Sequence, residues 1–245
     1  MKTTLHFILL STLCLASAAH AAVIFQENFD TLTSGTTVVG QNGWANNSGT
    51  GSSPVSNTLP AYSSPNYLSL YAGGTVQHSF TAASLTASDT SFNYYFMAGT
   101  SVVAGHNLQL SLRDASGYVF YMNIQGGLAS LDIGLINTTT TNKAFSSSLS
   151  KNVWYVFAAT IDQTTDVMSY SVAAASGGSS LLSSSITLSS TSINRFVVGS
   201  SASTASGDWS FDSLSINSVP EPGTTALAIG GGLFALIFLR KRSRA

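Results

Sequence analysis

The stretch HNLQLSLRDASGYVFYMNI, residues 106–124, alternates apolar and polar side chains with a period of two. The apolar positions on one face are Leu108, Leu110 and Leu112 in the first half, and Tyr118, Phe120, Met122 and Ile124 in the second. Successive side chains of an extended strand point to opposite sides, so this alternation predicts strands that bury one face.

Other segments of the middle carry similar strand signals. SFNYYFMAG at 91–99 sets one apolar face against another face that holds Asn93, Tyr95 and Met97. NVWYVFAATID at 152–162 is apolar on both faces, which predicts a central strand. The turn DQTTD and the segment VMSYSVAAAS after it predict a hairpin, whereas ASGGSSLLSSS at 175–185 predicts a loop.

The composition also favours strands. Ser and Thr make up 68 of the 245 residues, whereas charged residues make up only 8%. Low charge with abundant Thr, Val, Tyr and Phe argues against disorder and for β-structure. We therefore expect an all-β sandwich of about a dozen strands over residues 22–217, with almost no helix outside the two ends of the chain.

Three stretches resemble a known fold family. They are FQENFDTLTSGTTVVGQNGW at 25–44, WYVFAATID at 154–162 and FVVGSSASTASGDWSFDSLSI at 196–216. Together they resemble the concanavalin-like jelly roll, which laminin-G-type domains and legume lectins share, over most of residues 23–217. The resemblance implies a jelly-roll β-sandwich and leaves the activity open, because one fold hosts many functions.

Residues 1–21 have the pattern of a secretory signal peptide, with an apolar run at 5–15 and small residues behind it. Ala19 and Ala21 fill the two small positions of an A-x-A site, so we expect signal peptidase to cut between Ala21 and Ala22 after passage through the translocon. The alternative is a retained anchor, but the apolar run is shorter than a spanning helix requires.

The exported part of the chain is acidic and lacks cysteine. Cys14 is the only cysteine and lies in the signal, which excludes disulfides, cysteine nucleophiles and thiolate metal sites from residues 22–217. The basic residues between Ala22 and Ser218 are Arg113, Lys143, Lys151 and Arg195. Nine acidic residues bring the formal charge of this part to −5, so no nucleic-acid partner is expected.

The chain closes on SVPEPGTTALAIGGGLFALIFLRKRSRA, residues 218–245. Its uncharged run at 224–239 would span ~24 Å as a helix, against a membrane core of ~30 Å, so it predicts a marginal transmembrane helix. The basic residues at 240–244 place the C-terminus in the cytoplasm and the large domain outside.

The order of motifs in this tail resembles the PEP-CTERM sorting signal of Gram-negative bacteria. The matching residues are Val219, Pro220, Glu221 and Pro222 before the apolar run and Arg240, Lys241 and Arg242 after it. The resemblance implies that an exosortase removes the helix from an inner-membrane intermediate and passes the protein to the cell surface or extracellular matrix. The alternative is a plain stop-transfer anchor whose prolines only interrupt the chain.

Few residues are suited to catalysis. A glycosidase needs two carboxylates beside the scissile bond, but the only glutamate outside the tail is Glu27. We expect Glu27 and Asp30 to hold a strand-end turn; the alternative is that they face a cleft. His78 and His106 offer little for a serine triad or a zinc site. We expect no enzyme activity and no cofactor. Asp162 and Asp166 of DQTTD are the candidate calcium ligands, although such residues usually shape turns.

The polar faces of the predicted strands offer a candidate carbohydrate-binding surface. Its residues are Asn93, Tyr95, Gln109, Arg113, Tyr121 and Asn123. If their strands are neighbours, amide and guanidinium groups would bind hydroxyls while rings pack on sugar faces; the alternative is an ordinary solvated face. Trp44, Trp154 and Trp209 are expected to pack in the core or at its rim.

Two functions follow as hypotheses. The first is a lectin-like module that holds extracellular polysaccharide. The second is a structural envelope or biofilm matrix protein without a small ligand, whose Ser and Thr carry glycans. A carbohydrate-active enzyme is a third. A glycan array with the domain at 22–217 would separate the first two, and the strand order decides whether the polar residues form one patch.

Overall fold

The computed structural model describes residues 22–49, 53–63, 65–70, 73–80, 89–135, 140–189, 192–201 and 209–219. These residues form fifteen strands and no helix, and Val23–Ser218 is one compact unit. Within these ranges there is accordingly no helix with the length and apolarity to cross a membrane. The predicted signal peptide and the apolar run at 224–239 lie outside the described residues.

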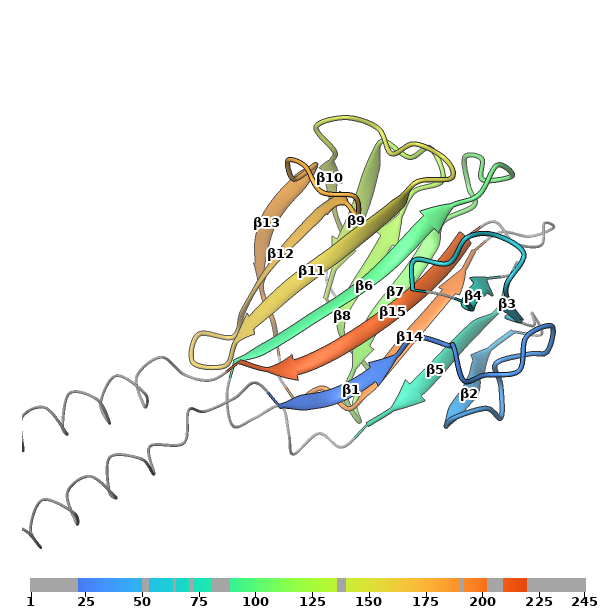
Figure 1. Cartoon of the computed structure of the whole chain (residues 1–245). Helices are drawn as coiled ribbons and strands as arrows, with labels where there is room; N and C mark the ends of the chain where they lie inside the picture. Colours follow the sequence, from blue (N-terminus) through green and yellow to red (C-terminus); the bar gives the residue numbers. More distant parts are fainter. Residues whose placement is uncertain are drawn as a thin grey trace, which may run out of the picture. The chain divides into compact units, whose positions relative to one another are not determined.

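The strands form two antiparallel sheets that face each other (Figure 1). The eight-stranded sheet, here the β11 sheet, has the order β13 (Leu182–Thr187), β12 (Val167–Ala174), β11 (Trp154–Asp162), β6 (Thr90–Ala98), β15 (Trp209–Ser218), β4 (Tyr67–Leu70) and β3 (Val55–Ser56), with β1 (Val23–Glu27) also paired to β15.

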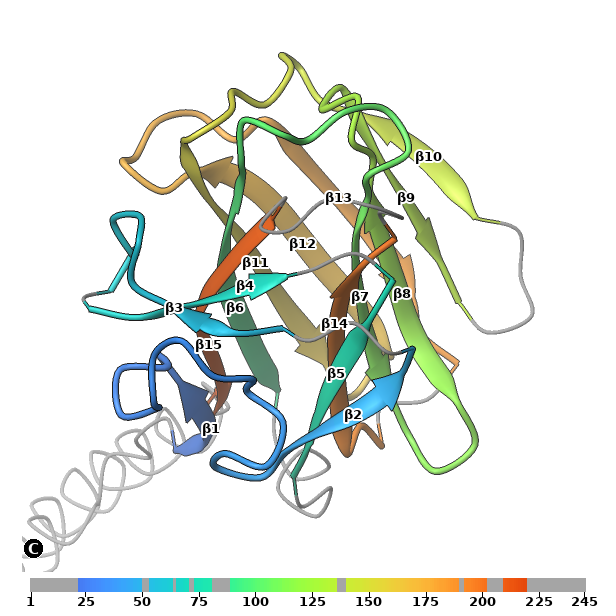
Figure 2. The ribbon, with the colours of Figure 1, turned by 90° about the vertical axis from the view of Figure 1, so that its right-hand side faces the viewer.

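The seven-stranded sheet, here the β7 sheet, lies behind the β11 sheet in Figure 1 and can be followed from the side in Figure 2. Its order is β10 (Thr141–Ala144), β9 (Ser130–Gly134), β8 (Tyr118–Ile124), β7 (Leu108–Arg113), β14 (Arg195–Ser200), β5 (Thr75–Ser79) and β2 (Trp44–Ser48). The described residues thus form the predicted all-β sandwich, with more strands than the dozen expected.

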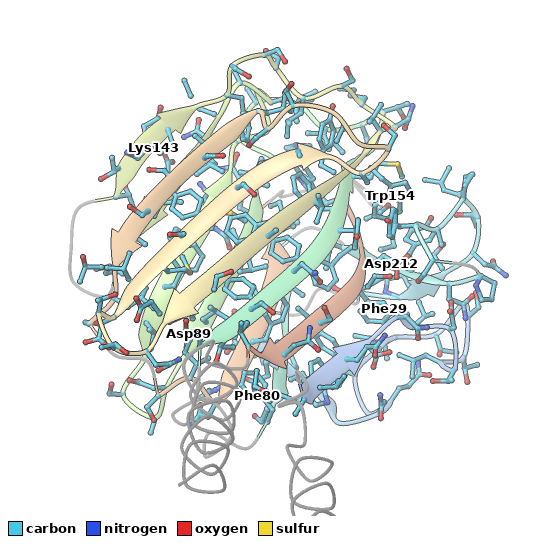
Figure 3. All side chains as sticks on the ribbon, turned by 60° about the vertical axis from the view of Figure 1, so that its left-hand side comes forward. Phe29, Phe80, Asp89, Lys143, Trp154 and Asp212 are labelled. Carbon is cyan, nitrogen blue, oxygen red and sulfur yellow. The ribbon has the colours of Figure 1, made fainter. Side chains whose placement is uncertain are left out.

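Aromatic rings fill the space between the sheets, as Figure 3 shows. The ring of Phe157 on β11 lies 5.2 Å from that of Tyr94 and 5.8 Å from that of Tyr170, and 6.2 Å from the ring of Phe120 in the opposite sheet. The hydroxyl of Tyr94 donates to the sulfur of Met122 across the same interface. Burial of such rings supplies most of the stability of a sandwich without disulfides.

Most of the predicted strand pattern is confirmed. The three leucines of β7 and the inward residues of β6 are buried, and β11 is an interior strand that forms a hairpin with β12. The loop predicted at 175–185 is partly wrong, because Leu182–Thr187 forms β13 at the edge of the β11 sheet. Only Leu182 and Ile186 mark its inward face, where they pack against the core, and the three serines between them make the segment resemble a loop.

Candidate functional site

The strand order divides the six candidate residues between the two sheets. Asn93 and Tyr95 lie on β6 of the β11 sheet, whereas Gln109, Arg113, Tyr121 and Asn123 lie on β7 and β8 of the β7 sheet. Their chain neighbours, such as Tyr94 and Leu110, are buried between the sheets, so the two groups point to opposite outer faces. The hypothesis of one patch is therefore wrong.

Four of the candidates do come together on the outside of the β7 sheet. Residues directly opposite each other in paired strands share a face, and the register sets three rows across β14, β7 and β8. The rows are Arg195–Arg113–Tyr118, Val197–Ser111–Tyr121 and Gly199–Gln109–Asn123. We call these residues, with Asn47 and Gln77, the β7 face.

A bulge in β8 places Tyr118 on this face. Leu112 pairs with Phe120 and Arg113 pairs with Tyr118, so Val119 is an extra residue and turns inward. Tyr118 is 39% exposed, and its predicted place in the core is wrong. The guanidinium carbon of Arg113 lies 3.9 Å from the centroid of its ring, in cation–π geometry.

A second bulge directs Asn47 to the same place. In the pairing of β2 with β5, Asn46 is opposite Val76 and Ser48 is opposite Thr75, so Asn47 is the extra residue. Its amide nitrogen donates to Thr75 Oγ1 at 2.7 Å, and its oxygen accepts from Arg113 Nη1 at 3.3 Å. Bulges commonly redirect a side chain in this way beside functional sites.

A small hollow of about 100 Å³ lies in the β7 face. It is lined by Asn47, Ser48, Thr75, Gln109, Leu110, Ser111, Arg113, Tyr118, Tyr121 and Val197. The short side chains Ser111 and Val197 of the middle row form its floor between longer neighbours. Because one water takes up ~30 Å³ of liquid, the hollow suits one substituent of a larger ligand rather than a whole small molecule.

The polar groups around the hollow are set up for hydrogen bonding. Gln109 Nε2 donates to the hydroxyl of Tyr121 at 3.3 Å, and burial raises the pKa of Tyr121, so that hydroxyl stays protonated at neutral pH. Asn123 Oδ1 is buried and accepts no hydrogen bond from the described residues. Burial lowers the pKa of Arg113; Tyr118 raises this pKa and the charge of Arg195 lowers it. Arg113 nevertheless remains a cation at neutral pH, as arginines do in proteins.

On the opposite face, the rings are engaged with the segment before β4. Tyr62 stacks on Tyr95 with centroids 3.5 Å apart, and burial, with the contribution of Tyr62, raises the pKa of Tyr95 to about 12. Trp154 Nε1 donates to the carbonyl of Pro60 at 3.0 Å, and Asn93 accepts from Ser215. Trp154 and Asp212 lie toward the same side of this sheet in Figure 3. Asn93 and Tyr95 thus have partners already.

The middle of this opposite face has a shallow hollow of about 420 Å³. Its outward residues are small, and they include Ser91, Ala158, Thr160, Ser169, Ser171 and Ser183. Its lining contains no charged side chain, and Asn93 is the one side-chain amide in it. The chemistry for binding a polar ligand is therefore concentrated on the β7 face.

Glu27 serves the local structure. Its carboxylate is 3% exposed and accepts from the main-chain nitrogen of Phe29 at 2.8 Å, from Asn42 Nδ2 at 2.8 Å and from Trp44 Nε1 at 3.2 Å. Asp30 accepts from the main-chain nitrogen of Asn66 at 3.1 Å. The two acids fix the segment after β1, in keeping with the turn role expected of them.

The remaining candidates also have structural contacts. Asp162 Oδ1 accepts from the main-chain nitrogens of Thr164 and Thr165 and so closes the β11–β12 hairpin. His78 bonds to the carbonyl of Asn42 and packs on Phe25. Trp44 and Trp209 are buried. Among the residues that the structure covers, no three His, Cys, Asp or Glu side chains gather as a metal site would require.

Sequence reasoning missed Tyr118, Asn47 and Arg195 as members of the β7 face. Both bulges break the strict alternation on which the strand prediction rests, and no apolar pattern marks the position of an extra residue. Arg195 is the first residue of a short, mostly apolar strand, and only the register of β14 against β7 brings it beside Arg113. A paired contact between distant strands has no local signal in one sequence.

Comparison with known proteins agrees with the predicted sorting signal in the tail and with the predicted fold of the domain. Residues 218–243 match the model of the PEP-CTERM protein-sorting motif. No curated protein sequence matches this chain.

Several solved structures share the fold. The CBM2 module of the evolved Dit of Lactobacillus casei BL23 phage J-1 is 9% identical, with a TM-score of 0.55 over 82% of this chain and 98% of that one. Lectin II from Ulex europaeus is 10% identical, with a TM-score of 0.54 over 81% and 100%. A carbohydrate esterase of the Shiga toxin-encoding bacteriophage phi24B is 10% identical, with a TM-score of 0.53 over 82% and 100%. At these identities the likeness shows a lectin-like jelly-roll sandwich.

Proposed function

We propose that this protein is a polysaccharide-binding protein of the bacterial cell surface or extracellular matrix, and that the β7 face is its binding surface. The PEP-CTERM motif implies export and sorting by an exosortase. We further propose that the chain passes through an inner-membrane intermediate held by its C-terminal helix before the tail is removed.

One observation carries the binding proposal: two bulges bring Asn47 and Tyr118 to Arg113, beside Tyr121 and Gln109. Aromatic rings offer flat apolar area to the faces of sugars, and Tyr adds a polar hydroxyl to that area. Amide and guanidinium groups bind hydroxyl oxygens in defined directions. The face therefore combines the two kinds of contact that a polysaccharide needs.

The nature of the fold relatives supports binding rather than catalysis. A carbohydrate-binding module and a lectin are among them, although an esterase shares the fold as well. In this chain the carboxylate of Glu27 is committed to three internal hydrogen bonds. We therefore propose a module that holds its ligand and leaves it unchanged.

A polysaccharide panel tests the proposal with the full chain, purified in detergent. We expect binding to at least one polymer, and we expect Tyr121→Ala to weaken it tenfold or more, which corresponds to about 1.4 kcal/mol. The matched control is Tyr62→Ala, which removes a 40% exposed tyrosine from the opposite face and should leave binding intact. Absence of binding to the whole panel would contradict the proposal and favour a structural matrix protein without a ligand.

A further inference from the structure

We propose that the polysaccharide bound by the β7 face carries carboxylate groups, as polymers of uronic acids do, and that Arg113 and Arg195 bind these groups. The inference rests on the proposed function and names its ligand class. It is carried by the placement of the two arginines, by their partners, and by the distribution of acceptors along the face.

The two arginines stand directly opposite each other on neighbouring strands. Arg113 of β7 and Arg195 of β14 are Cα partners in the register. The stretch 22–218 has a formal charge of −5 and only four basic residues, so two of the four occupy adjacent positions on one sheet face. Like charges directly opposite each other destabilise a sheet. An anion between them would remove this repulsion.

Both guanidinium groups donate hydrogen bonds to neutral oxygens. Arg113 donates to Ser111 Oγ at 3.2 Å and to Asn47 Oδ1 at 3.3 Å. Arg195 donates to Gln77 Oε1 at 3.4 Å and to the carbonyl of Asp114 at 3.5 Å. These bonds, with the ring of Tyr118, hold the groups in place and leave their charges for a ligand. A planar guanidinium suits a carboxylate because two parallel hydrogen bonds can form.

The rest of the face suits the hydroxyl groups of the same polymer. Gln109, which forms a row with Asn123, precedes Arg113 by four residues on β7. At the usual rise of a strand, this row lies about 13 Å from Arg113. Both side chains are amides, whose nitrogens donate to hydroxyl groups and whose oxygens accept from them.

The acidic side chain of Asp132, beside Asn123, determines how an acidic sugar would be oriented on the β7 face. Asp132 of β9 is the Cα partner of Asn123, and its oxygens accept from Gln125 Nε2 at 2.6 Å and from Asn142 Nδ2 at 2.8 Å. A negative charge there repels carboxylates, whereas the two arginines attract them. A sugar acid on this face should therefore direct its carboxylate to the arginine row.

The test uses two polymers that differ only at the carboxyl group: polygalacturonate, in which it is ionised, and its neutral methyl ester. Binding of each to the full chain in detergent is measured by calorimetry. We expect the acidic form to bind at least tenfold more tightly than the ester, and we expect this preference to shrink when salt is raised from 0.1 to 1 M, because the screening length falls from about 10 Å to about 3 Å.

Three variants locate the effect. Arg195→Gln should reduce the preference for the acidic form at least fivefold. Arg113→Lys, which keeps the charge and loses the planar fork, should reduce binding of the acidic form without a matching loss for the ester. Lys151→Gln is the control, because it removes one positive charge outside the β7 face, where Lys151 Nζ bonds to the carbonyl of Thr100.

The outcomes separate this inference from the proposed function. Equal binding of the acid and the ester, or binding of neutral polymers alone on the panel, overturns the carboxylate specificity and leaves polysaccharide binding in place. Failure to bind either form or any other polysaccharide overturns the proposed function itself. A preference for acid that survives Arg195→Gln and Arg113→Lys overturns the assignment to these residues.

Discussion

At the scale of single residues, the carboxyl of Asp212 lies in an unusual environment. A bulge in β15 at Ser213, whose φ is +50°, lies beside it, and Asp212 is 0% exposed. The carboxylate accepts from the main-chain nitrogens of Ser63 at 2.9 Å and Ser213 at 2.7 Å. Burial raises the pKa of Asp212 to about 6, even though these hydrogen bonds act in the opposite direction.

This shift predicts a particular pH dependence of stability. The folded state holds the proton more tightly than the unfolded chain, whose aspartate has the ordinary pKa of 3.8. The resulting stabilisation is complete below pH 3.8 and is lost as the pH rises through about 6. We expect the free energy of unfolding of the wild type to fall, relative to Asp212→Asn, by on the order of 2 kcal/mol between pH 4 and pH 7.

Urea unfolding of the two proteins across this pH range measures the difference. Asp166→Asn is the matched control, since it removes the same charge from an exposed turn position, and we expect it to keep the slope of the wild type. If Asp212→Asn keeps that slope as well, the carboxyl is not responsible for it.

At the scale of elements, β11 shows how one strand serves two environments. Phe157 points inward and its ring stacks with those of Tyr94 and Tyr170, whereas its neighbour Val156 lies half-buried on the outer face. We expect Phe157→Ala to lower the free energy of unfolding by about 4 kcal/mol, through lost burial and the cavity left behind.

Val156→Ala is the control on the same strand, and we expect it to cost about 1 kcal/mol, since that side chain is only partly buried. Both values are measured by urea unfolding at one pH. Similar costs for the two substitutions would mean that β11 does not have the inward and outward faces described above.

Elements also show what one sequence can predict. Alternation correctly predicted the inward faces of β6 and β7, because burial of one face forces a period of two. It failed at Tyr118, where the extra residue Val119 reverses the face, and at β13, where only Leu182 and Ile186 mark the inward face and three serines lie between them. Strand type is thus a local property, whereas bulges and edge strands depend on neighbours that the sequence does not identify.

The candidate site follows the same division. The sequence indicated outward polar residues on individual strands, and Gln109, Arg113, Tyr121 and Asn123 do share a face. It did not separate them from Asn93 and Tyr95, because assignment to a sheet depends on the long connections between strands. Arg195 entered the site only through its pairing with β7, 82 positions away in the chain.

At the scale of the whole molecule, the tail decides where the domain works. Replacing Glu221 by Ala, with both prolines kept, should leave membrane insertion intact, because this residue precedes the apolar run at 224–239. If the motif at 218–243 is read by an exosortase, this variant should not be processed. A form of the protein that keeps its tail should then accumulate in the membrane fraction.

Intact-mass measurement of the wild-type surface protein completes this test. A mature mass without the segment LFALIFLRKRSRA supports removal of the tail. A mature mass that includes the segment contradicts it and makes the tail a lasting anchor.

The position of β15 as the last strand of the domain has a mechanical consequence. β15 pairs with β6 on one side and with β1 and β4 on the other (Figure 1). A pull on Ser218 along the axis of β15 would load the hydrogen bonds of both ladders together rather than one bond after another. Force applied at the end of β15 would therefore act on the sandwich in shear and be shared between the neighbours of this strand on both sides.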